Sequence, residues 1–373
     1  MWALVLKEFR QVRRDRRTLA MMIVLPLLLL IVFGYAASFD VSDIPTAVVG
    51  PGAAIASGHL PSVFHVVKTD PTGGRDEATE LLRDGDAVVA VVADPASPAV
   101  LISGADLFSA KAAEVALARA VQAQSAQAPS TTAAAPQQTT PLPTNVKVEV
   151  LFNPDLKTSA VMVPALAGMI LLFIGTITTS LGVVRERQAG TLELLAVMPF
   201  RPRDVFVGKL APYFLIAVID LTVVVGAGTL LFDVPFNGSV AVLALGALLF
   251  LFVTLGLGVL VSSVSQNSGQ AIQLAMMMLL PQILLSGLIF PVASMAPGVR
   301  WISYLLPLTY FNQISRGVML RGAGIGALAG SFLMLTLMSV VVFGLAVFRF
   351  RGYLAPAEKR HRAPKAVAAE ATR

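Results

Sequence analysis

The sequence contains no cysteine and only three histidines, His59, His65 and His361. Disulfide bonds and thiolate metal sites are therefore excluded, and the histidines are too widely spaced to indicate a metal-binding cluster. Charge is also scarce, because Asp, Glu, Lys and Arg make up 13% of the residues, against about 25% in a soluble domain. We therefore expect no metal site, and we expect much of the surface to face something other than water.

Six long apolar runs account for much of the 56% hydrophobic content. A helix rises 1.5 Å per residue, so about 20 apolar residues cross the hydrocarbon core of a bilayer. The runs are residues 18–39, 160–184, 210–232, 240–264, 271–290 and 325–348. The first follows a basic stretch, as the core of a signal peptide does, but its 22 residues are too many for one, and we interpret it as a retained anchor. The sequence predicts an all-α integral membrane protein with six transmembrane helices.

The distribution of Lys and Arg predicts the orientation, because cations near span ends resist translocation. Six precede the first span, five lie in residues 185–209 and seven follow residue 348. On the other side there are none in residues 233–238 and three in residues 291–324. Both termini, including a basic tail at residues 349–373, are therefore predicted to be cytoplasmic. Cations placed at membrane edges argue against nucleic-acid binding.

Residues 40–159 are predicted to form an extracytoplasmic α/β domain between the first and second spans. Strand-like runs alternate with helical ones there, and a low-complexity stretch lies between the second helical run and the last strand-like run. The strand-like runs are residues 46–49, 65–68, 87–92, 99–102 and 146–152, the helical runs are 75–83 and 107–123, and the low-complexity stretch is 128–143. The domain shows no acid pair of defined spacing, nucleophile elbow or phosphate loop. We therefore expect it to bind or gate, with no catalytic residues.

Two further segments are predicted to lie at the membrane surface. Residues 291–324 are too polar, and too broken by Pro297 and Pro307, to form a span, so one or two short interfacial or re-entrant helices are expected. Residues 1–17 place apolar side chains on one helical face and cations on others. They predict an amphipathic cytoplasmic interface helix, which is either a topogenic anchor or also a contact for a partner.

The cytoplasmic loop 185–209 is predicted to carry a short helix. Gly190 breaks the helix of the second span, Thr191 can cap a new one, and Pro199 ends it. A helix of two turns is marginal by itself. Its apolar residues, among them Leu195, therefore need something to pack against.

The chain lacks a phosphate-binding loop. Such a loop needs the pattern G-x-x-x-x-G-K-[ST], so that backbone N–H groups and a lysine can hold the phosphates. Gly208 and Lys209 are followed by Leu210, and Arg203 stands where the first glycine belongs. ATP hydrolysis is therefore expected on another chain.

The order of these segments resembles the permease subunits of type-2 ABC transporters, in the multidrug-exporter branch, over nearly the whole chain. The most specific piece is ERQAGTLELLAVMPFRPRDVFVGK at residues 186–209, which is similar to the family's loop of Glu-Arg, Gly-Thr-x-Glu, Pro and Gly-Lys. Residues 153–166 and 306–320 are also similar to the family, though less specific.

The resemblance implies that the short helix docks into a groove on a separate ABC-type ATPase subunit, which binds ATP and Mg²⁺. The residues that match the family's loop, or belong to its contact surface, are Glu186, Gly190, Thr191, Glu193, Leu195, Pro199 and Lys209. It also implies pairing with a second copy or a homologous permease in the bacterial inner membrane, and export of a drug-like or lipid-like amphipathic compound. A periplasmic adaptor is left open, as is an ordinary solvated loop in place of the coupling helix.

Polar residues inside the spans are candidates for a substrate pathway. Asp220 lies mid-span, where a carboxylate costs about 2.5–3.5 kcal/mol on insertion scales. It either pairs across the bundle or contacts a cationic substrate, while Gln282 and Asn312 either bond between helices or line a path. Gly326 and Gly330, and the pair Gly256 and Gly258, are expected to permit close helix contact. The rival functions are an ion-coupled secondary transporter that uses Asp220, and a membrane scaffold or receptor that transports nothing.

Overall fold

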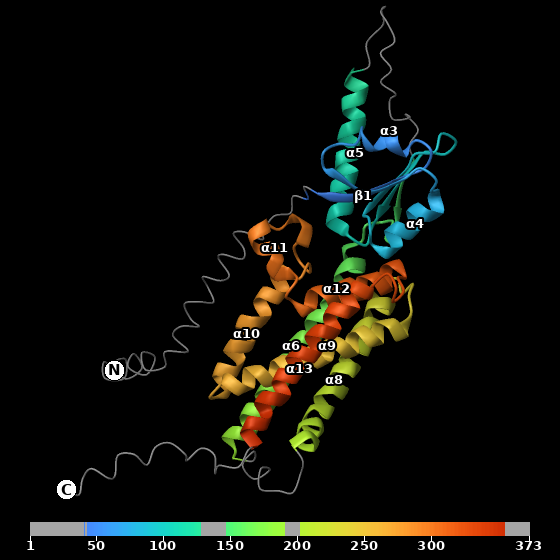
Figure 1. Ribbon diagram of the computed structural model, residues 1–373. Helices are drawn as coiled ribbons and strands as arrows, with labels where there is room; N and C mark the ends of the chain where they lie inside the picture. The colour runs from blue at the N-terminus through green and yellow to red at the C-terminus, as the bar shows by residue number, and fades with distance from the viewer. Residues whose placement is uncertain (1–40, 42, 128–146, 191–201, 355–373) are drawn as a thin grey trace, which may run out of the picture.

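The computed structural model describes residues 41, 43–127, 147–190 and 202–354. It has two parts, a sheet domain (residues 41–152) and a helical bundle (residues 158–354), which are stacked end to end (Figure 1). The predicted interface helix 1–17, the first span 18–39 and the tail after residue 354 lie outside the described residues.

The sheet domain is built on a five-stranded sheet with the order β2-β1-β3-β4-β5. Its strands are β1 (Ile44–Val49), β2 (Phe64–Asp70), β3 (Val89–Val92), β4 (Ala99–Ser103) and β5 (Lys147–Leu151). β1 runs parallel to β2 and β3, β4 is antiparallel to β3, and β5 is parallel to β4. The central strands β1, β3 and β4 are apolar apart from Thr46 and Ser103, because both of their faces are covered. All five predicted strands are thus confirmed.

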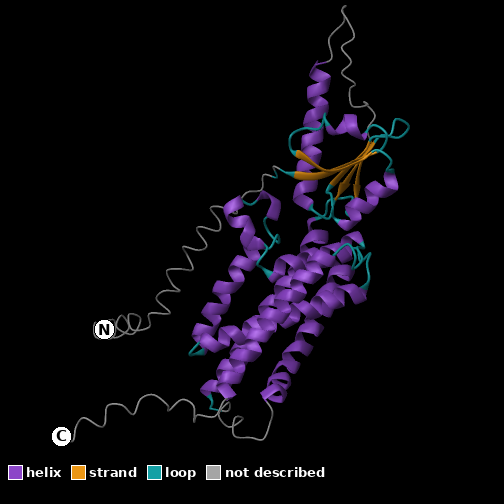
Figure 2. Ribbon diagram, viewed as in Figure 1, coloured by secondary structure: helices purple, strands orange, loops and turns teal. Residues whose placement is uncertain are grey.

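Helices cover both faces of this sheet (Figure 2). α3 (Ala53–Ser57) and α5 (Leu107–Gln127) pack on one face, and α4 (Arg75–Asp84) packs on the other. Arg75 Nη2 donates to Glu149 Oε2 at 2.7 Å, which ties α4 to the edge strand β5. The two long helices match the predicted helical runs, whereas the five-residue α3 was not expected.

Five helices of the bundle are long and apolar enough to cross a membrane. They are α6 (Thr158–Gln188), α8 (Pro202–Leu231), α9 (Val240–Val264), α10 (Ser268–Leu285) and α13 (Ala329–Leu354). They alternate in direction, so the bundle has a sheet end, next to the sheet domain, and a loop end, where α6 and α13 finish (Figure 1). These five correspond to the second to sixth predicted spans.

The prediction was wrong at two helix ends. The fifth apolar run was expected to be helical to residue 290, but α10 stops at Leu285 because Gly287 has a left-handed φ of +81° and Pro291 follows. The sixth was expected from residue 325, but α13 begins at Ala329. Gly326 therefore precedes the helix, and a Cβ placed on it or on Gly330 would touch nothing within 4 Å. Within the described chain, this glycine pair packs no helices together.

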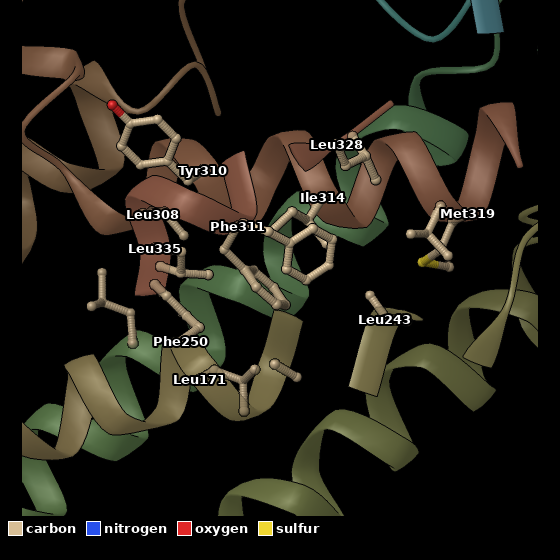
Figure 3. Close-up of a cluster of buried hydrophobic side chains, with 14 of the residues drawn as sticks. Leu171, Leu243, Phe250, Leu308, Tyr310, Phe311, Ile314, Met319, Leu328 and Leu335 are labelled. Carbon is tan, nitrogen blue, oxygen red and sulfur yellow. The ribbon is translucent and has the colours of Figure 1, made fainter. Parts of the chain in front are cut away.

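Residues 292–321 form two short α-helices, where one or two were predicted, together with a 3-10 turn and a π-helical turn. They are the 3-10 turn η1 (Val292–Ser294), α11 (Pro297–Ser303), α12 (Pro307–Arg316) and the π-helical η2 (Gly317–Arg321). α12 is buried among α6, α9 and α13, and Phe311 stacks on Phe250 of α9 with ring centroids 4.6 Å apart (Figure 3). α12 is thus shielded by neighbouring helices, whereas Trp301 and Tyr304 at α11 stay exposed.

α6 and α9 approach each other closely at glycines. A Cβ on Gly258 would lie 2.7 Å from the Cβ of Thr179 and 2.8 Å from the carbonyl oxygen of Thr176. On the facing helix, a Cβ on Gly175 would lie 2.5 Å from Thr254 Oγ1. The expectation that Gly258 permits close packing is therefore confirmed.

The sheet domain is joined to α6 through Asn153, which is 5% exposed. Its amide Nδ2 donates to the carbonyl oxygens of Gly104 (3.3 Å) and Lys157 (3.1 Å), and its Oδ1 accepts from the Lys157 backbone N–H at 3.0 Å. One side chain thereby links the loop after β4 to the first turn of α6. The orientation of α6 is fixed relative to the sheet.

We expect Gly258→Leu to separate α6 from α9 and to lower the free energy of unfolding by at least about 2 kcal/mol, since the backbone of Thr176 leaves no room for a side chain. Urea unfolding of the purified chain in detergent micelles measures this. Gly344→Leu, on the open face of α13, is the matched control and should unfold like the parent chain. Equal stability of the two variants would show that the α6–α9 contact is not tight.

Candidate functional site

The predicted coupling residues belong to the loop end of the bundle. Glu186 is partly buried in the last turn of α6, and Gly190 follows that helix. Thr191, Glu193, Leu195 and Pro199 lie outside the described residues, and Lys209 is on α8, in a part of it whose side chains are not described. Since α6 ends and α8 begins at the same end of the bundle (Figure 1), the connection between them starts and finishes there.

Gly190 ends α6 as the sequence predicted. Its φ of +72° lies in the left-handed region, where a side chain is disfavoured, and its N–H donates to the carbonyl oxygen of Arg187 at 3.2 Å. A Cβ placed on it would touch nothing within 4 Å. The requirement for glycine is therefore conformational rather than steric.

Arg187, which the sequence analysis did not single out, anchors the end of α6. Its Nη1 donates to the carbonyl oxygen of Ser262 at 3.2 Å, and its Nη2 donates to that of Ser265. These carbonyls belong to the last turn of α9, where helix carbonyls lack partners and the helix dipole is negative. The Arg187 guanidinium donates hydrogen bonds to these carbonyls and places a positive charge at the negative end of the helix dipole. The residues are 75 and 78 positions apart, so no local pattern indicates the contact.

The turn between α9 and α10 is itself held rigidly. Asn267 Oδ1 accepts from the Gln270 backbone N–H at 2.9 Å as an N-cap, and Gln270 Oε1 accepts from the Gln266 N–H at 3.0 Å. Ser268 Oγ donates to Gln188 Oε1 at 3.0 Å. The start of the 185–209 loop is thus fixed to a second, well-capped corner at the loop end.

A cationic hollow lies beside these contacts. It has a volume of about 460 Å³ and is lined by Arg187 of α6, by residues 263–266 and by Arg349 of α13. No carboxylate is among the residues that line it. This surface can accept acidic groups of a partner that reaches the loop end.

The polar candidates within the spans are not gathered into one site. Asn312, on α12, lines a cavity at the sheet end, whereas Asp220 and Gln282 are not among the described residues lining it. Each of the three has a buried oxygen without a hydrogen-bond partner among the described residues: Asp220 Oδ2, Gln282 Oε1 and Asn312 Oδ1. Asn312 Nδ2 bonds to Ser286 O and Oγ at 3.4 and 3.3 Å. For Asn312, bonding between helices is therefore observed.

An apolar groove runs between α8 and α9. It has a volume of about 490 Å³, and Thr222 is the polar side chain among the residues that line it. Its walls include Phe214, Val225, Leu243 and Leu251. Such a surface suits a hydrocarbon or aromatic group.

Comparison with known proteins matches almost the whole chain. The model of a family described as ABC-2 family transporter protein matches residues 16–348. The probable multidrug ABC transporter permease YbhS of Escherichia coli (strain K12) is 28% identical over 359 residues, which cover 92% of this chain and 94% of that protein. The probable multidrug ABC transporter permease YbhR of the same strain is 27% identical over 368 residues, with coverages of 94% and 98%. ABC transporter G family member 20 of Dictyostelium discoideum is 27% identical over 176 residues, 47% of this chain and 24% of that protein.

We expect Arg187→Ala to loosen the loop end, because the last carbonyls of α9 would lose their donors. Hydrogen exchange should become about tenfold faster, equivalent to ~1.4 kcal/mol, at backbone amides of residues 262–270. Arg185→Ala removes an exposed arginine two residues away and serves as the control. Unchanged exchange in Arg187→Ala would show that this contact does not hold the corner.

Proposed function

The chain belongs to the ABC-2 transporter family and is a multi-pass permease subunit, and from this premise we propose that it exports an amphipathic, drug-like or lipid-like compound across a bacterial inner membrane. Two kinds of observation support the substrate class. The relatives YbhS and YbhR are described as probable multidrug ABC transporter permeases. The groove between α8 and α9 offers an almost wholly apolar surface on the outside of the bundle.

The observation that carries the proposal is the arrangement of the loop end. The connection between α6 and α8 starts beside a corner held by Arg187 and by the Ser268–Gln188 hydrogen bond. A push on this connection is therefore delivered to α6, α9 and α10 together. The sequence has no phosphate-binding loop, so the push comes from a separate ATPase subunit that binds ATP and Mg²⁺.

The loop end faces the cytoplasm in this proposal, and the sheet domain faces outward. Arg187 and Arg349 at the loop end, and the cations of the flanking segments, favour the cytoplasmic side. The permease works with a second copy of itself or a homologous permease, and residues 191–198 contact the ATPase. An outer adaptor is a further partner that the acidic sheet domain could receive.

Asp220 supports an alternative, ion-coupled mechanism. Its carboxylate is partly buried on α8, and Oδ2 has no hydrogen-bond partner among the described residues. A carboxylate in that position can carry a proton or attract a cation. The family membership favours ATP as the energy source, and Asp220 then contributes to substrate choice.

We expect Gly190→Val to uncouple the permease from its ATPase, because a β-branched residue is strained at a φ of +72°. Transport by the reconstituted complex should fall about tenfold or more, corresponding to ~1.4 kcal/mol. Ala189→Val, at an ordinary helical φ of −79°, is the matched control and should transport normally. Full transport by Gly190→Val, or ATP hydrolysis by the purified permease alone, would contradict the proposed coupling.

We expect Asp220→Asn to reduce export of cationic compounds about tenfold while leaving neutral ones unaffected, since the amide keeps the size but loses the charge. Paired efflux assays with a cationic and a neutral dye in vesicles measure the difference. Sensitivity to vanadate together with insensitivity to a proton uncoupler is the expected pattern. The reverse pattern would favour the ion-coupled alternative.

A further inference from the structure

A second cavity lies at the sheet end, where the sheet domain meets the short helices. It has a volume of about 260 Å³. The sheet domain contributes Ser103, Asp106 and Phe108 to its wall, and the bundle contributes Ser286, Asn312, Arg316 and Arg321. Pockets for drug-sized molecules typically measure about 300–1,000 Å³, so this space suits one head group rather than a whole amphiphile.

The two arginines in this wall differ in their charge balance. Arg321 packs against Gly85, where a Cβ would lie 1.9 Å from its Nη1, and it is influenced by Asp84, Asp86 and Asp106. Three carboxylates of the sheet domain therefore oppose the effect of burial on Arg321, although its Nε, like that of Arg316, has no hydrogen-bond partner among the described residues.

Arg316 has no comparable set of partners. No hydrogen bond or ion pair joins its guanidinium to another described residue, and its Nε is buried without a partner. Burial lowers the pKa of Arg316, and the charge that opposes this effect is Asp106. The Asp106 carboxylate is itself occupied as a helix cap, since it accepts from Ser109 Oγ at 2.9 Å and from the Ser109 N–H at 3.4 Å. A buried charge without a close counterion is costly unless an anion joins it.

Asn312 lies one helical turn before Arg316 and so shares its face of α12. The carbonyl oxygen of Ser286 can only accept, which fixes Nδ2 of Asn312 as the group that bonds to it. Oδ1 is then left as a buried acceptor without a partner among the described residues. The cavity wall therefore carries a cation without an ion-pair partner next to a hydrogen-bond acceptor without a donor among the described residues.

We propose that this cavity binds a phosphate-type anion that carries a neighbouring hydroxyl or amine. The anion neutralises Arg316, and the hydroxyl or amine donates to Oδ1 of Asn312. The head group of an anionic membrane lipid and a soluble phosphate ester share this chemistry. The site lies at the opposite end of the bundle from the coupling loop, so it is independent of the proposed ATPase contact.

The test uses the full chain in nanodiscs of phosphatidylcholine, a lipid whose head group has no such donor. Replacing a third of the lipid by phosphatidylglycerol, or adding glycerol phosphate in solution, should raise the midpoint of thermal unfolding by about 5 °C. A response to phosphatidylglycerol alone identifies a lipid head group as the ligand, and a response to glycerol phosphate alone identifies a soluble ester. No response to either overturns the proposal.

Three variants test whether the shift in the unfolding midpoint comes from ligand binding in this cavity. Arg316→Gln should abolish it, yet without ligand it should unfold no earlier than the parent chain, because it removes a charge that lacks a close partner. Arg119→Gln removes an exposed charge from α5 and should respond normally. Asp106→Asn keeps an acceptor for the helix cap and should bind the anion about fivefold more tightly. An equal midpoint shift in Arg316→Gln and the parent chain would exclude this cavity as the site.

Discussion

Close contact between α6 and α9 is the constraint on which the bundle depends. Helices in a bilayer gain little from leaving lipid, so their association relies on close packing, which small residues permit. Gly175 on α6 and Gly258 on α9 are the small residues that permit this close packing. The contact leaves α12 room to lie across both of them, where Phe311 stacks on Phe250. A non-spanning helix can therefore be buried at the sheet end and complete the platform beneath the sheet domain.

The two ends of the bundle use polar groups for different purposes. At the loop end, Arg187 satisfies carbonyls that the end of α9 cannot satisfy itself, so charge holds a corner together. At the sheet end, Arg316 satisfies nothing in the described chain and faces a cavity. The first arrangement suits transmission of force between subunits of an ABC transporter. The second suits reception of a ligand.

Much of the fold could be predicted because short stretches of sequence determine its helices, strands and breaks. The central strands are buried on both faces and read as short apolar runs, and the break at Gly190 needs one residue type at one conformation. The functional contacts could not be predicted, because Arg187 meets residues 75 and more positions away. Nothing in the sequence singles out Arg316, whose Nε is buried without a hydrogen-bond partner among the described residues. Gly326 and Gly330 had the spacing of a packing motif, but the helix begins after the first of them.

The continuity of α6 connects these observations. Its 31 residues span about 46 Å as one helix that continues through Pro164, and it is secured by Asn153 at its start and by Arg187 at its finish. A rotation of α6 at the loop end is therefore passed to the sheet domain through Asn153. Under the proposed function, torque from the ATPase subunit would travel along this one helix and turn the base on which the sheet stands.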